Sequence, residues 1–202
     1  MGKSAQAETQ WRQCVEQVPE YVAGWKGLGR NLVTQGRLEE ALQVSARLQR
    51  DLGTDGSVIA ALVAESRGDF PAARQILEET LHAQPDSAEA LRELSRLLFE
   101  RFHPLDALQL LERLVQLDPQ DASAHCNLGA VYRLSGRPEE ALESLQRSLQ
   151  LRPHSLHARL NLARTLVSAG RTDQAAEAWR AVLELDPQNA ESLEMLALAA
   201  DS

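Results

Sequence analysis

The chain has 202 residues, of which 44% are hydrophobic, and its formal net charge is −8. This composition is too apolar for a disordered chain. The chain has no run of about 18 apolar residues, so we expect no membrane span. The acidic balance argues against nucleic-acid binding, which requires an excess of Lys and Arg. Two distant cysteines provide neither a disulfide framework nor a thiolate zinc site, so we expect a cytoplasmic protein without cofactor or metal.

Small residues and prolines recur along the chain at a nearly constant interval. Alanine recurs in steps of 34, 32, 34, 34 and 34 residues, at Ala7, Ala41, Ala73, Ala107, Ala141 and Ala175. Proline recurs every 34 residues at Pro85, Pro119, Pro153 and Pro187. Glycine marks the middle of each unit at Gly36, Gly68, Gly136 and Gly170, and Phe102 replaces it once. A fixed period of this length indicates an array of stacked repeats.

The predicted elements follow this register. Residues 5–19 are predicted to form one helix, the second half of a repeat, and residues 190–202 a first helix or a capping helix. Five two-helix units are predicted between them, over 22–53, 54–87, 88–121, 122–155 and 156–189.

One joint between units differs from the others. The one step of 32 residues is two residues shorter than the others, and we place this deletion near residues 53–56. Ser45 stands where the other units carry a bulky residue. We therefore expect an altered stacking angle and the weakest joint of the array there.

The fourth unit shows why each unit reads as a helical hairpin. Residues 124–132 carry apolar side chains at helical spacing, and Gly136 ends that helix because glycine tolerates the left-handed conformation. Pro138 suits the first turn of the next helix, where its missing N–H is not needed. Pro153 then stops the second helix.

The hairpins are predicted to close on small residues and to stack on large ones. The small pairs are Gly29/Ala41, Ala61/Ala73, Ser95/Ala107, Gly129/Ala141 and Ala163/Ala175. The large residues predicted to fill the space between units are Trp25, Leu28, Leu32, Leu77, Leu91, Leu94, Leu98, Leu111, Tyr132, Leu145, Leu162, Leu166 and Trp179.

The unit resembles the tetratricopeptide repeat (TPR). The fourth unit carries its pattern as Leu128-Gly129, Tyr132, Gly136, Ala141, Leu145 and Pro153. The resemblance covers almost the whole chain and implies an all-α fold, a right-handed α-solenoid of helix-turn-helix repeats. It also implies a concave face formed mainly by the first helix of each repeat.

Ten residues on that face are candidates for binding a peptide or a partner segment. They are Lys26, Arg30, Arg92, Arg96, Phe99, Asn127, Arg133, His157, Asn161 and Arg164. Arginine forks onto carboxylates, so the six cations favour an acidic peptide. The alternative is that these cations pair with the protein's own carboxylates, such as Glu65, Glu89 or Glu93.

Two further resemblances bear on the same face. Asn127 and Asn161 occupy a slot that carries a ladder of asparagines in the TPR superhelix of O-GlcNAc transferases, and an amide both donates and accepts. Only two of five repeats have this asparagine, which is too few to imply that family's function. The two-carboxylate clamp of chaperone adaptors is matched at Lys26, but Arg30 and Ile59 stand where it needs asparagine. We do not expect chaperone-tail binding.

The sequence offers no group of residues suited to catalysis. His125 and Cys126 are adjacent in a helix, so their side chains diverge by about 100° and cannot pair as base and nucleophile. His154 and His157 lack a third ligand for zinc. We therefore expect a non-catalytic scaffold for protein–protein interaction.

Two alternatives stay open. The stretch from Trp11 to Arg37 resembles TPR segments of bacterial family-2 glycosyltransferases, which implies an accessory role within a larger enzyme. Alternatively, the chain is a structural spacer that associates with itself through apolar ends at Trp11, Val15, Leu193 and Leu196.

Overall fold

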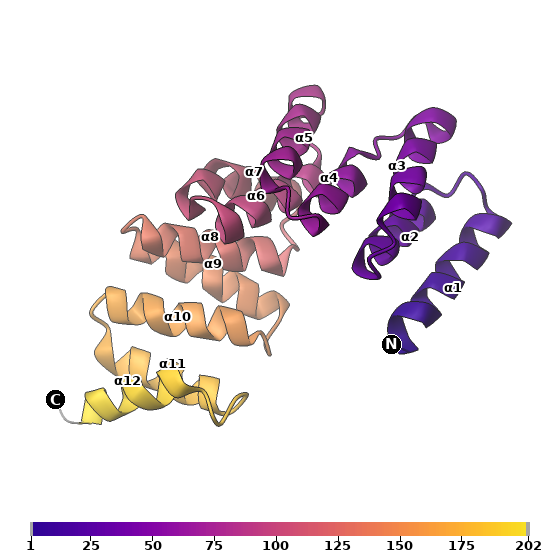
Figure 1. The fold of residues 1–202 in the computed structure, drawn as a ribbon. Coiled ribbons are helices and arrows are strands. Elements are labelled where there is room, and N and C mark those ends of the chain that lie inside the picture. The colour runs from indigo at the N-terminus through magenta and orange to yellow at the C-terminus, as the bar shows by residue number, and fades with distance from the viewer. Residues whose placement is uncertain (1, 201–202) are drawn as a thin grey trace. The chain divides into compact units, whose positions relative to one another are not determined.

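The computed structural model describes residues 2–200, and it is all-α over these residues (Figure 1). It divides into two compact units, here called unit 1, which ends at Leu97, and unit 2, which begins at Leu98. The helices are α1 (Gly2–Gln17), α2 (Val22–Thr34), α3 (Leu38–Leu52), α4 (Ser57–Ser66), α5 (Phe70–Ala83), α6 (Ala88–Arg101), the 3₁₀ helix η1 (Pro104–Ala107), α7 (Leu108–Leu117), α8 (Ala122–Leu134), α9 (Pro138–Leu151), α10 (Leu156–Ser168), α11 (Thr172–Leu183) and α12 (Ala190–Ala200).

Four hairpins turn through a glycine, as the sequence predicts. Gly36, Gly68, Gly136 and Gly170 all have φ between 68° and 79°. This left-handed conformation costs a residue with a Cβ, which explains why glycine recurs there. The amide after each glycine donates back to the carbonyl five residues earlier, for example from Arg137 N to Tyr132 O at 2.9 Å.

The third repeat turns differently because Phe102 stands at the glycine position. The described residues include no non-glycine residue with positive φ. The chain instead leaves α6 and enters η1, with Pro104 in its first turn. α7 then has only 10 residues, whereas α5 and α9 have 14 each.

The two-residue shortfall is found at the start of α4. This helix has 10 residues, whereas α2, α8 and α10 have 13 each. α3 has 15 residues against 14 in α5 and α9. α4 is thus three residues shorter and α3 one residue longer than their equivalents, a net difference of two residues. Both changes lie next to the link of residues 53–56 that the spacing indicated.

The predicted large residues make up much of the core of each unit. Of the thirteen, ten are at most 7% exposed, and Trp25, Tyr132 and Leu162 are half-buried. In unit 1, Leu28, Leu48 and Ile59 share a cluster against which Trp11 of α1 packs. In unit 2, the corresponding cluster is built around Trp179.

All ten predicted small residues are buried, with one difference in what they touch. A Cβ added to Gly129 would lie 3.0 Å from Ala141 O, within its own hairpin as predicted. A Cβ added to Gly29 would instead lie 2.5 Å from Ile59 Cδ1 in the next repeat. Gly29 therefore makes room for a side chain of the neighbouring repeat.

Candidate functional site

The first helices of unit 1 carry a network of ion pairs. Lys26 Nζ on α2 lies 2.5 Å from Glu89 Oε2 on α6. Arg30, one turn along α2, donates to Glu93 Oε1 at 2.7 Å and to Glu89 Oε1 at 3.0 Å. Residues 59 to 63 positions apart are thus joined side chain to side chain. Burial raises the pKa of Glu89, but the hydrogen bonds from Lys26 and Arg30 outweigh it and hold that pKa below its usual value.

The same network continues to α4 through Arg96. Its guanidinium donates to both carboxylate oxygens of Glu65, at 3.0 and 2.5 Å, and its Nε donates to Glu93 at 3.1 Å. These hydrogen bonds, first of all those to Glu65, raise the pKa of Arg96. Three predicted binding cations, Lys26, Arg30 and Arg96, are therefore already paired with carboxylates of this chain, while Arg92 is half-buried on α6.

In unit 2, Arg164 is also paired. Its Nε and Nη2 donate to the two oxygens of Glu191 on α12, at 2.7 and 2.5 Å. The hydrogen bond between Arg164 and Glu191 lowers the pKa of Glu191 and raises the pKa of Arg164. The pair ties α10 to α12.

Arg133 on α8 differs from the other cations of this set. Its Nε is buried without a hydrogen-bond partner among residues 2–200, although the residue as a whole is half-buried. Burial, and then the charge of Arg164, lower its pKa, while Glu191 acts in the opposite direction. Arg133 is thus a partly desolvated cation whose charge no carboxylate within the described chain neutralises at contact distance.

The predicted asparagines lie on the same helices as Arg133 and Arg164. Asn161 Nδ2 on α10 donates to Cys126 Sγ on α8 at 3.6 Å, which places the two helices' polar positions side by side. Asn127 is half-buried next to Cys126. Burial raises the pKa of the Cys126 thiol, which therefore stays protonated.

We call this surface the α8–α10–α12 face. Its residues are Cys126, Asn127, Arg133, Asn161, Arg164 and Glu191. The two remaining candidates of unit 2 are Phe99, half-buried on α6, and His157, exposed at the start of α10.

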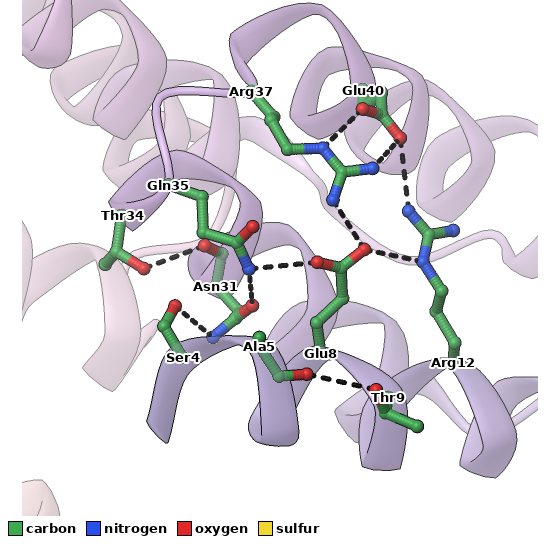
Figure 2. Close-up of polar contacts among 10 residues, drawn as sticks. All are labelled: Ser4, Ala5, Glu8, Thr9, Arg12, Asn31, Thr34, Gln35, Arg37 and Glu40. Carbon is green, nitrogen blue, oxygen red and sulfur yellow. Dashed lines mark hydrogen bonds and ion pairs between the residues drawn. The ribbon is translucent and has the colours of Figure 1, made fainter. Parts of the chain in front are cut away.

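A polar cluster that the sequence analysis did not identify joins α1 to the α2–α3 hairpin (Figure 2). Glu8 on α1 accepts from Arg12 at 2.7 Å, from Arg37 at 2.6 Å and from Gln35 at 3.0 Å. Glu40 accepts from Arg37 and Arg12. The i,i+4 spacing of Glu8 and Arg12 and the i,i+3 spacing of Arg37 and Glu40 were visible in the sequence, but the link between the helices was not.

The described residues provide neither a metal site nor a membrane-spanning helix. No three His, Cys, Asp or Glu side chains of the described residues gather closely enough to hold a metal ion. No described helix is both long enough and apolar enough to cross a membrane.

Several solved structures are similar to this chain. A crystal structure of MamA has a TM-score of 0.66 and 26% identity, covering 70% of this chain and 82% of MamA. YrrB, described as a TPR protein with an unusual peptide-binding site, has a TM-score of 0.70 and 21% identity, covering 91% of this chain and 96% of YrrB. A chain of the hetero-tetramer Cut9–Hcn1 has a TM-score of 0.76 and 17% identity, covering 98% of this chain and 40% of that one.

A comparison with curated proteins gave no match. Models of the tetratricopeptide repeat match residues 1–55, 66–130 and 132–199. These matches cover most of the chain and agree with the helical hairpins and their glycine turns, so the chain belongs to the tetratricopeptide repeat family.

Proposed function

We propose that this chain is a protein-interaction scaffold that binds an extended peptide with an acidic residue on the α8–α10–α12 face. The observation that carries the proposal is the unpartnered, buried Nε of Arg133. The peptide-binding site named for YrrB supports a similar use of this fold. The Cut9–Hcn1 assembly supports a protein partner more generally.

Arg133 favours a carboxylate for an energetic reason. A buried donor without an acceptor costs about 1–3 kcal/mol, and a hydrogen bond to a charged partner returns about 1.5–3 kcal/mol. Glu191 accepts from Arg164 and makes no hydrogen bond to Arg133 Nε. An acidic side chain of a bound peptide would supply the missing acceptor once the half-buried Arg133 side chain turns its Nε towards the peptide.

Asn127 and Asn161 suit the backbone of the same peptide. Each amide offers a donor and an acceptor, which matches the N–H and C=O of an extended chain. The amide nitrogen of Asn161 donates to the sulfur of Cys126, which is a weak acceptor. Exchanging that contact for a peptide carbonyl would therefore be favourable.

The inner positions of unit 1 fit an acidic peptide less well. Lys26, Arg30 and Arg96 would have to exchange Glu65, Glu89 and Glu93 for a ligand carboxylate, which gains little net energy. The alternative set out in the sequence analysis, pairing within the protein, therefore describes these three cations. Arg164 is paired with Glu191 and falls under the same argument. Peptide binding is therefore proposed for Asn127, Arg133 and Asn161, with Phe99 and His157 as further candidates of unit 2.

The test is selection of peptides from a random displayed library, followed by fluorescence anisotropy with each selected peptide. We expect Arg133→Gln to weaken binding at least tenfold, since about 1.4 kcal/mol corresponds to a factor of ten. The matched control is Arg152→Gln, because Arg152 is exposed after α9 and its side chain donates a hydrogen bond to the hydroxyl of Ser123. Equal affinity of the native chain and the Arg133→Gln variant for every selected peptide would refute the site.

The accessory role in a larger bacterial enzyme stays a prediction of the sequence. An upstream reading frame without a glycosyltransferase domain would contradict it.

A further inference from the structure

An apolar groove lies along the outer side of α11 and α12. Its volume is about 630 Å³, and Val167, Ala176, Trp179, Leu196 and Leu198 are among the residues that line it. Leu198 is 59% exposed, and Leu193 on the same helix is 50% exposed. These are the two most exposed large apolar side chains among the described residues.

The repeat register indicates what kind of element fits this groove. At the preceding joint, Leu142 of α9 lies in one cluster with Ala175 and Trp179 of α11, the next second helix. The residue 34 positions beyond Leu142 is Ala176, which lines the groove. The groove therefore occupies the place of one more second helix, packed on α12 as a first helix.

Helix α1 has the register of a second helix. Ala7 stands in the alanine series Ala41, Ala73, Ala107, Ala141 and Ala175. Trp11 stands at the position of Trp179, through Ser45, Leu77, Leu111 and Leu145. α1 packs on α2 through Trp11, whose ring a Cβ on Gly27 would meet at 2.7 Å. No first helix of its own repeat covers its other side among the described residues.

Each hairpin closes on one small residue of its first helix and one of its second helix, and we call these two repeat positions slots. The slots on α12 and α1 are complementary. The slots of the five internal pairs are all buried. The next slot in the first-helix series is Ala197 of α12, which is exposed, and the first slot in the second-helix series is Ala7, which is half-buried. Ala197 and Ala7 are thus the two halves of one further pair, and each lacks its partner within the described chain.

We propose that α1 of a second copy of this chain seats against α12 in the groove, so that the two helices complete one repeat between two molecules. Ala197 of one copy would meet Ala7 of the other, and Leu198 would be covered. The contact joins two different surfaces, so each dimer retains one free surface of each kind and can add further copies.

The unsubstituted 202-residue chain gives the first test, by light scattering coupled to size exclusion from low to high micromolar concentration. We expect the mass to rise above that of one chain with concentration. A constant monomer mass of 22.3 kDa over the whole range would overturn the proposal.

Two blocking variants give the sharper test. Ala197→Arg places a long charged side chain in the slot on α12, and Ala7→Arg does so on α1, so each variant alone is expected to be a monomer. Mixed together they should form a one-to-one heterodimer, because one α1 and one α12 remain free. Self-association of Ala7→Arg alone would show that two α12 ends pair instead, and would overturn the proposal.

Ala23→Arg is the matched control, since Ala23 is an exposed helical alanine outside both slots. It should associate as the native chain does. Circular dichroism of every variant checks folding, and Leu198→Glu offers a second block on α12 at a side chain already exposed. Arg133→Gln should leave association unchanged, which separates this result from that of the peptide-binding test.

Discussion

Ser45 Oγ on α3 donates a hydrogen bond of 2.8 Å to the carbonyl oxygen of Gly56, the N-cap residue just before α4. A Cβ added to Gly56 would lie 2.3 Å from the carbonyl oxygen of Ser45, so the two backbones are in direct contact. The shortened start of α4 brings the link this close to α3. A bulky residue at position 45 would occupy the space that the link fills, which explains the serine.

Gly56→Ala is therefore expected to destabilise the protein by about 1–3 kcal/mol through overpacking. Gly56 has φ −100° and ψ 0°, which alanine can adopt, so the effect reports the steric contact and not a backbone preference. Ser45→Leu should be destabilising for the same reason, although leucine is usual at that repeat position. Urea unfolding followed by circular dichroism measures both changes.

Ser66→Leu serves as the control for the second substitution, since Ser66 is exposed at the end of α4. Its effect should stay within about 0.5 kcal/mol, as for most surface substitutions. An increase in stability for Ser45→Leu would contradict the packing described for this joint.

The sequence predicted the architecture because the same residue types recur at equivalent positions of several units. Gly136 and its equivalents predicted the turns, and the alanine series predicted the close approach of helices. The departures were harder to predict because each occurs once. Phe102 gave no sign that a 3₁₀ helix would replace the glycine turn, and Ser45 gave no sign that its partner is the backbone of Gly56.

The cluster around Glu8 predicts a specific dependence of stability on pH. Hydrogen bonds from Arg12, Arg37 and Gln35 lower the pKa of Glu8 from 4.5 to about 2. Since the folded pKa lies below the unfolded one, the stabilisation is present above about pH 4.5 and is lost as the pH falls towards 2. Glu8→Gln should therefore lower the melting temperature at pH 7 and have little effect near pH 2.

Glu16→Gln is the matched control on the same helix, since Glu16 is exposed. It removes the same charge without touching the cluster, and its melting temperature should follow that of the native chain at each pH. A Glu8→Gln difference that does not change between pH 7 and pH 2 would show that the cluster does not stabilise α1 through the ionised carboxylate.

The candidate site was less predictable than the fold. Repeat positions placed Lys26, Arg30 and Arg96 on one face, but residues 59 to 63 positions apart had to be brought together before their carboxylate partners could be identified. Glu191 lies on α12, outside the ten candidate positions, so the sequence does not predict that it pairs with Arg164. Arg133 stood out only when its neighbours were known, because a missing partner leaves no trace in the sequence.

The network in unit 1 predicts coupled effects of substitution. Glu93 is 6% exposed and accepts from both Arg30 and Arg96, so removing one donor leaves a buried carboxylate only partly satisfied. Arg96→Gln should cost about 1–3 kcal/mol. Combined with Glu65→Gln, the cost should be less than the sum, with a coupling of about 0.5–3 kcal/mol measured by urea unfolding. Strict additivity would mean that the pair contributes no interaction energy.

Gly129 and Leu145 set helix propensity against packing. Glycine within a helix costs about 1 kcal/mol relative to alanine, so propensity alone predicts that Gly129→Ala stabilises α8. A Cβ on Gly129 would, however, lie 2.5 Å from Leu145 Cγ and 3.0 Å from Ala141 O, and Leu145 is fully buried. We expect packing to decide the sign, with Gly129→Ala destabilising the protein by about 1–3 kcal/mol. In a Leu145→Ala background the clash with the leucine is removed, so the same substitution should cost less or become stabilising. A cost that is equal in both backgrounds, measured by urea unfolding, would place the strain at the Ala141 carbonyl and not at the leucine.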